Sequence, residues 1–156
     1  MYFILYAFGL IVSYFVLAMF LQFFFYGKTG NYSFKIAHIL YVLVFLLCVM
    51  IGVFLIPDPE FANRIQHALG GGFIMVFLFY LSGLASGVKM TKIQFFFLSI
   101  LVATAFGVAN EFAESLLQLQ FGLRFSSYLE DTWYDLWANG LGSLIAASFF
   151  TFLTKK

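Results

Sequence analysis

The chain has 156 residues, of which 63% are hydrophobic and 10% are charged, and its formal net charge is +1. A soluble domain carries roughly a quarter charged residues, so this composition, with a mean hydropathy of +1.00, argues against a water-exposed surface. The near-zero net charge gives no reason to expect nucleic-acid binding. Length and composition together predict a single integral membrane domain over residues 1–156.

Five apolar runs are long enough, or nearly long enough, to cross a bilayer, which takes about 20 residues. In chain order they are Tyr2–Tyr26, Ile36–Ile56, Gln66–Ser86, Ile93–Leu117 and Trp133–Leu153. The breaks between them are polar or turn-like, and the clearest is PDPEFANR from Pro57 to Arg64, because proline interrupts a helix. We therefore predict an all-α, polytopic membrane protein, a helical bundle of about five transmembrane helices.

Basic residues are distributed unevenly between the two sides of such a bundle. One side holds the lysines of the first break, the third break and the tail, namely Lys28, Lys35, Lys89, Lys92, Lys155 and Lys156. The other side holds Arg64 and Arg124. Because lysine and arginine accumulate on the cytoplasmic side of membranes, we expect the N-terminus outside and the C-terminus in the cytoplasm.

Polar residues inside or at the edges of the runs gather on the predicted outer side. They are Arg64 and His67 at the start of the third run, Glu111 and Glu114 near the end of the fourth, and Asp131, Asp135 and Asn139 at the start of the fifth. Carboxylates within a membrane are costly unless paired, hydrated or protonated, so they face the bundle interior or a water-filled cavity. Three helix ends are therefore expected to share one recess.

The spacing of these residues supports the same expectation. Glu111 and Glu114 are three residues apart, and Asp131, Asp135 and Asn139 follow at intervals of four, so each set lies along one helix face. Small residues let membrane helices approach closely. Glycines of this kind stand beside the polar residues, at Gly70–Gly72, Gly107, Gly140 and Gly142.

Several kinds of chemistry fit this set of residues. The candidate catalytic residues are Glu111, Glu114, Asp135 and His67, and the candidate ligand-binding residues are Arg64, Arg124, Asp131 and Asn139. Carboxylates with a histidine can bind a divalent metal or form an acid–base pair. The arginines can pair with carboxylates or bind an anionic ligand. The structural alternative is that the polar residues only link helices through hydrogen bonds.

The same residues resemble the VanZ-like family of small bacterial membrane proteins. The similar motifs are RIQH at 64–67, NEFAE at 110–114, Arg124 and DLWANGLG at 135–142, all within about residues 64–148. Two motifs depart from the family pattern. Its usual lysine is Arg64 here, and its usual Asp-Glu-x-x-Gln is Asn110-Glu111-x-x-Glu114.

The resemblance implies a role in the bacterial cell envelope, since the family is named for an association with resistance to a glycopeptide antibiotic. We expect a multi-pass protein of the bacterial cytoplasmic membrane whose outward-facing acidic cleft binds or modifies a cell-wall or lipid-linked molecule. Its expected partners are membrane lipid, such a precursor, and a protein partner or a second copy of the chain. The alternative is a non-enzymatic membrane subunit or assembly factor. An ion path ranks lowest, because no acidic residues continue inward along the runs.

Overall fold

The computed structural model describes residues 2–30, 32–122 and 129–154. These residues form α1 (Tyr2–Tyr26), α2 (Ile36–Phe54), α3 (Pro59–Ile65), the π-helix η1 (Gln66–Phe73), α4 (Ile74–Ser86), α5 (Lys92–Phe121) and α6 (Leu129–Leu153). Because α3, η1 and α4 follow one another without a break, they form one membrane-length rod. Five rods are long and apolar enough to cross a membrane, and the described residues contain no strand. The predicted all-α bundle of five spans is confirmed.

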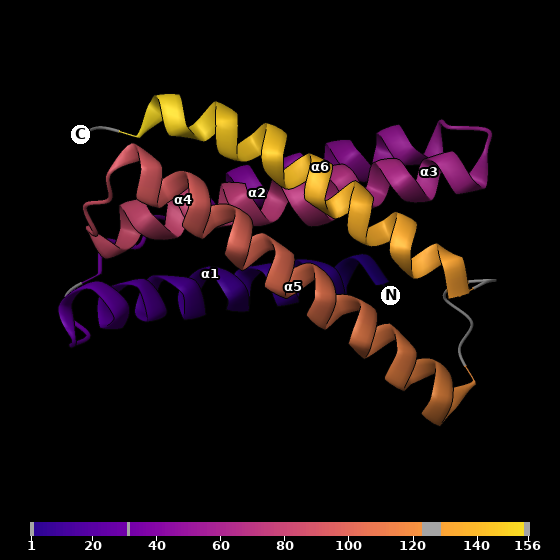
Figure 1. The fold of residues 1–156 in the computed structure, drawn as a ribbon, viewed down its shortest axis with the longest axis horizontal. Helices are drawn as coiled ribbons and strands as arrows, with labels where there is room; N and C mark the ends of the chain where they lie inside the picture. Colours follow the sequence, from indigo (N-terminus) through magenta and orange to yellow (C-terminus); the bar gives the residue numbers. More distant parts are fainter. Residues whose placement is uncertain (1, 31, 123–128, 155–156) are drawn as a thin grey trace.

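Successive rods run in opposite directions (Figure 1). The α1–α2 and α4–α5 connections and the end of α6 lie at one end of the bundle, which we call the lysine end because it carries Lys28, Lys35, Lys89 and Lys92. The α2–α3 connection, the end of α5 and the start of α6 lie at the other, which we call the acidic end. Which end faces outward stays a prediction from the distribution of lysines.

The α3–η1–α4 rod is the most enclosed of the five. Ile74, Val76 and Phe79 in α4 have no exposed surface, while large apolar side chains such as Phe54 and Phe152 are 88% and 79% exposed on the outside of the bundle. α6 packs mainly against η1 and α5, and α1 packs against α4. An outer surface of this kind suits contact with lipid chains, where apolar exposure carries no cost.

The third rod begins earlier than the sequence indicates. The break was expected to continue to Arg64, but α3 already begins at Pro59. Asp58 caps this helix, since its Oδ1 accepts hydrogen bonds from the backbone N–H of Glu60 (3.0 Å) and Phe61 (3.4 Å). Proline at the first helical position loses no hydrogen bond there. The residues before His67 are therefore held on a helix instead of in a loop.

Loss of this cap should have a small, measurable effect. Replacing Asp58 by alanine is expected to lower the free energy of unfolding by about 1 kcal/mol, because two N–H groups lose their acceptor. Unfolding in mixed detergent micelles, followed by circular dichroism, measures the loss. Asp58→Asn keeps an acceptor and should retain most of the stability; an equal loss in both variants would contradict the capping role.

The π-helix η1 was not predicted. Such segments are rare and often accompany functional sites. A Cβ atom at Gly71 would collide with the Asn139 side chain, and one at Gly72 would collide with the Asn139 backbone. From the other side, a Cβ atom at Gly142 would collide with the Ala68 carbonyl. The backbones of η1 and α6 therefore touch directly, and this contact draws the start of η1 against α6.

Candidate functional site

His67 lies in η1 between carboxylates from two other helices. Its Nδ1 is 3.8 Å from Glu111 Oε1 in α5, and its Nε2 is 3.4 Å from Asp135 Oδ2 in α6. The Asn139 side-chain nitrogen lies 3.4 Å from Nδ1. The exposed fractions of Glu111, Asp135 and Asn139 are only 8%, 3% and 4%. The structure thus brings three helices together around one imidazole at the acidic end.

Asp135 is held from the side opposite His67. Arg64 Nη1 and Asn63 Nδ2 both donate to Asp135 Oδ1, the latter over 3.0 Å. Arg64 Nη2 also forms an ion pair with Asp131 Oδ1 at 2.5 Å. Since Oδ1 of Asp135 is engaged by these two donors, Oδ2 is the oxygen that faces the imidazole. A carboxylate in this position fixes the orientation of a histidine ring and the nitrogen that carries its proton.

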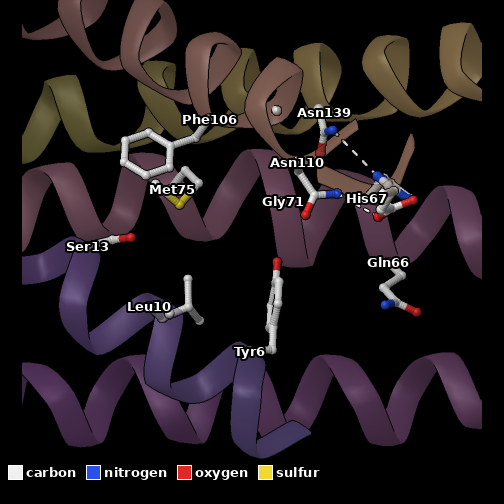
Figure 2. Close-up of a pocket in the computed structure, with 13 residues that line it drawn as sticks. Tyr6, Leu10, Ser13, Gln66, His67, Gly71, Met75, Phe106, Asn110 and Asn139 are labelled. Carbon is white, nitrogen blue, oxygen red and sulfur yellow. Dashed lines mark hydrogen bonds between the residues drawn. The ribbon is translucent and has the colours of Figure 1, made fainter. Parts of the chain in front are cut away.

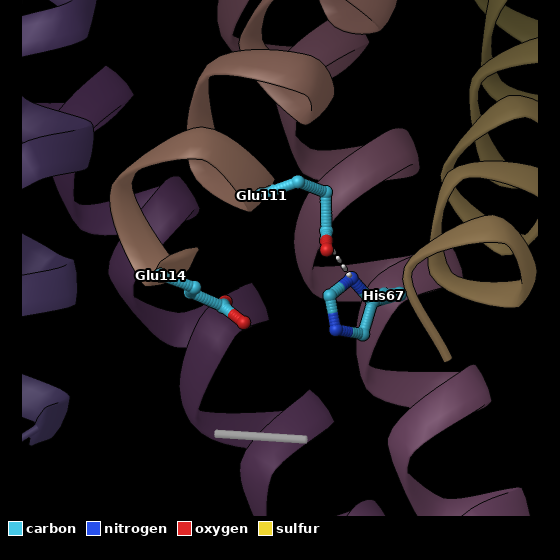
Figure 3. A group of neighbouring side chains, drawn as sticks. All are labelled: His67, Glu111 and Glu114. Atoms are coloured by element: carbon cyan, nitrogen blue, oxygen red, sulfur yellow. Dashed lines mark ion pairs between the residues drawn. The ribbon is translucent and has the colours of Figure 1, made fainter. Parts of the chain in front are cut away.

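Glu111 and Glu114 extend from α5 toward His67 (Figure 3). One ligand atom from each of these three residues lies within 4.8 Å of the others. Glu114 Oε1 accepts a hydrogen bond of 2.7 Å from Asn110. Within the described part of the chain, Glu111 Oε1 and Asn139 Oδ1 are buried and have no hydrogen-bond partner. Buried polar atoms are almost always paired, so these two point to an additional group at the site.

A cavity of about 200 Å³ lies beside His67 (Figure 2). It is lined by Tyr6, Gly9, Leu10 and Ser13 of α1, Gln66, His67 and Gly71 of η1, Met75 of α4, Phe106, Gly107, Asn110 and Glu114 of α5, and Asn139 of α6. Drug-sized ligands occupy about 300–1,000 Å³, so this space suits a small polar group. Glu111 and Asp135 do not line it and reach it through His67.

The predicted site residues therefore fall into three groups. His67, Glu114 and Asn139 line the cavity. Glu111 and Asp135 do not line the cavity but lie next to the two ring nitrogens of His67. Arg64 also does not line the cavity and pairs with both Asp131 and Asp135. Arg124 lies outside the described residues, so its predicted ligand-binding role stays a prediction.

Three further residues belong to the site and were not among the site residues predicted from the sequence. Asn63 bonds Asp135, the ring of Tyr134 lies 5.0 Å from the Arg64 guanidinium carbon, and the Tyr6 hydroxyl donates to the Gly70 carbonyl. One indication in the sequence that Asn63 belongs to the site is its position directly before Arg64. Tyr6 lies in an apolar run far from the other polar residues, and nothing in the sequence connects it to them.

The buried polar side chains in the half of the bundle nearer the lysine end differ in kind from those at the acidic end. Its buried polar side chains include Gln22, His38, Ser82, Ser86 and Ser99, and no carboxylate is among the buried residues described there. His38 forms a hydrogen bond of 2.9 Å with the Tyr14 hydroxyl, which fits a structural histidine. Among the described residues, the buried carboxylates therefore lie at the acidic end only, and no chain of acidic residues continues toward the lysine end.

A bundle of five membrane-length rods with a buried polar cluster at one end defines the class, a multi-pass helical membrane protein. The family described as "Predicted membrane protein (DUF2238)" matches residues 2–156, so the chain belongs to this family. No curated protein and no solved structure matches the chain. The family description names the membrane and no reaction, so the VanZ-like resemblance of residues 64–148 stays a proposal.

Proposed function

We propose that this protein binds and modifies the polar group of a cell-wall or lipid-linked molecule at the outer face of a bacterial cytoplasmic membrane. The observation that carries this proposal is the position of His67, between Glu111 and Asp135 and at the wall of a cavity. Hydrogen bonds that only link membrane helices contribute about 0.6 kcal/mol each. Such a linking role gives no reason for a buried Glu111 oxygen that has no hydrogen-bond partner in the part of the chain that the structure describes.

The residues divide by what they touch. Arg64, Asn63 and Asp135 are positioning residues, because they act on the cavity through the imidazole of His67. His67 and Glu114 touch the cavity itself and are the candidates for contact with the ligand. A histidine beside carboxylates can transfer protons or can activate water through a bound metal ion, and both kinds of chemistry use these same side chains.

A lipid-linked ligand fits the surroundings of the cavity. An apolar groove of about 460 Å³ lies between α1 and α2 and is lined by Ile4, Ala7, Phe8, Ile11, Leu40, Leu43, Val44 and Leu47. Leu10 lines the cavity and Ile11 lines the groove, so both spaces lie along the same turns of α1 but on different faces of the helix. Apolar surface for a lipid chain is therefore present at the depth of the cavity.

The resemblance to the VanZ-like family also supports a role at the bacterial cell envelope. Its motifs at 64–67, 110–114 and 135–142 contain the residues that converge on the site: Arg64, His67, Glu111, Glu114, Asp135 and Asn139. We propose on this basis that the protein contributes to resistance against a glycopeptide antibiotic. The support is the similarity of motif order and the shared location of these residues at the acidic end.

Complementation in cells tests this function. A strain that lacks the gene is given the wild-type chain or the variants His67→Gln, Glu111→Gln or Glu60→Gln, and its susceptibility to a glycopeptide antibiotic is measured. We expect the first two variants to lose the protective effect and Glu60→Gln, at an exposed position of α3, to keep it. Membrane fractions probed with an antibody must show equal amounts of each chain. Full protection by both site variants would refute the proposal.

A second candidate function is favoured by the outer part of α5. Among residues 112–122, every residue except Glu114 is exposed, including Phe112, Leu119 and Phe121. A helix end that is exposed on all sides suits docking on another membrane protein, as a non-enzymatic subunit or assembly factor would require. Purification in mild detergent distinguishes the two: a stable partner that is lost with Leu119→Ser favours the subunit, whereas a clean monomer or homodimer counts against it.

A further inference from the structure

We propose that His67, Glu111 and Glu114 bind one divalent first-row metal ion, such as Zn²⁺ or Mn²⁺. This inference rests on the proposed function only in that both use the same site. The binding of a metal can be measured without knowledge of the reaction. Four features of the site support a bound cation: the spacing of the ligand atoms, a buried oxygen that accepts no hydrogen bond from the described residues, the charges of the two glutamates and the surroundings of the imidazole.

The ligand atoms are close to the spacing that an ion requires. One atom each from His67, Glu111 and Glu114 lies within 4.8 Å of the other two. A tetrahedral ion with bonds of about 2.1 Å holds its ligands about 3.4 Å apart. The largest separation therefore exceeds this spacing by up to about 1.4 Å. Rotation of the glutamate side chains can close it, with the Asn110–Glu114 hydrogen bond giving way. His67 is the less adjustable member, because Asp135 holds its ring.

An unpaired buried oxygen provides an independent sign of a ligand. Glu111 is only 8% exposed, and its side chain interacts with that of Thr132. Its Oε1 lies 3.8 Å from His67 Nδ1 and has no hydrogen-bond partner among the described residues. Asn139 Oδ1, beside the same imidazole, is also buried and unpaired there. Burying such an oxygen without a partner costs about 1–3 kcal/mol, and more for a charged group. Coordination of a cation would offset this cost for Glu111.

The balance of charge also favours a cation. At this end of the bundle the clustered carboxylates are Asp131, Asp135, Glu111 and Glu114, and the described cation that pairs with them is Arg64. Arg64 is engaged by the two aspartates, so Glu111 and Glu114 have no lysine or arginine partner among the described residues. Buried carboxylates this close together are neutralised by protonation or by a bound cation. A divalent ion between the two glutamates would take the place of protonation.

The surroundings of His67 match those of a metal-binding histidine. Such a residue usually donates its second ring N–H to a carboxylate, which fixes the ring and leaves the other nitrogen free to bind the ion. Here Asp135 Oδ2 lies 3.4 Å from Nε2, and Nδ1 is the nitrogen on the side of Glu111. The Asn139 side-chain nitrogen also lies 3.4 Å from Nδ1, so an ion bound there would replace this contact. Arg64 and Asn63 in turn hold Asp135. One nitrogen and two carboxylate ligands suit Zn²⁺ or Mn²⁺ better than Ca²⁺ or Mg²⁺, which prefer oxygen alone.

Titration of the purified, untagged full chain tests the site. The protein is stripped with a chelator in detergent, and Zn²⁺ or Mn²⁺ is added in a calorimeter. We expect one ion per chain, an affinity at least about tenfold lower in Glu111→Gln and Glu114→Gln, and no change in Glu60→Gln. Asp135→Asn should also lower the affinity, by about 10- to 100-fold, because it loosens the ring. Pulsed electron paramagnetic resonance of bound Mn²⁺ should show coupling to nitrogen that disappears in His67→Ala.

The results separate this inference from the proposed function. No binding of either ion by the wild-type chain overturns the metal site, and so does unchanged affinity in both Glu111→Gln and Glu114→Gln. If the wild-type chain binds neither ion but His67→Gln still loses protection in cells, the proposed function is retained with acid–base chemistry in place of a metal ion. If the metal binds with the expected losses but every variant still protects, the metal site stands and the proposed function fails.

Discussion

Replacing Gly142 by alanine will strongly destabilise the bundle, whereas the same replacement at Gly140 will not. A Cβ atom at Gly142 would collide with the backbone carbonyl of Ala68 in η1, while one at Gly140 would meet nothing within 4 Å. Overpacking costs about 1–3 kcal/mol where side chains can adjust. Here the obstacle is backbone, so we expect Gly142→Ala to lower the free energy of unfolding by about 3 kcal/mol or more.

The two glycines form a matched pair for this measurement, since both lie in α6 and both substitutions add one methyl group. Gly140→Ala should be neutral or stabilising by about 0.5–1 kcal/mol, because alanine is the better helix former. Reversible unfolding in mixed micelles gives both values. Equal stability of the two variants would mean that η1 and α6 do not meet through their backbones at Gly142.

The second large effect is expected at Arg64. Replacing it by methionine leaves Asp135, whose side chain is 4% exposed, without its charged partner. Breaking a buried ion pair on one side costs about 3–5 kcal/mol. Because Asn63 would still donate to Asp135, we expect the lower end of this range, about 3 kcal/mol.

A double-mutant cycle distinguishes this explanation from a loss of packing. The variants are Arg64→Met, Asp135→Leu and the two combined, each unfolded under the same conditions. If the cost arises from an uncompensated buried charge, the combined variant will be more stable than the sum of the single losses predicts, by about 1–3 kcal/mol. Strict additivity would show that the pair is not coupled. The exposed Asp58, which forms no ion pair with Arg64 in the described structure, gives an additive reference with Asp58→Asn.

Much of the architecture could be predicted because it depends on local properties of the chain. The five spans follow from the length of the apolar runs, and the structure confirms them. The gathering of polar residues at one end follows from where Arg64, His67, Glu111 and Asp135 fall along those runs. Segment length and the cost of burying charge in lipid act on each run separately, so neighbouring helices do not have to be known.

The pairing of particular atoms depends on how the helices pack, which is not a local property. The π-helix η1, the contact of Gly72 and Gly142 with the opposing backbones, and the approach of Tyr6 from α1 all arise from close packing between segments far apart in sequence. Packing also directs Arg64 toward Asp135 and buries Glu111 Oε1 where none of the described residues donates a hydrogen bond to it. A single sequence records which residues are polar and small, but the distance between an imidazole and a carboxylate is set only when backbones meet in three dimensions.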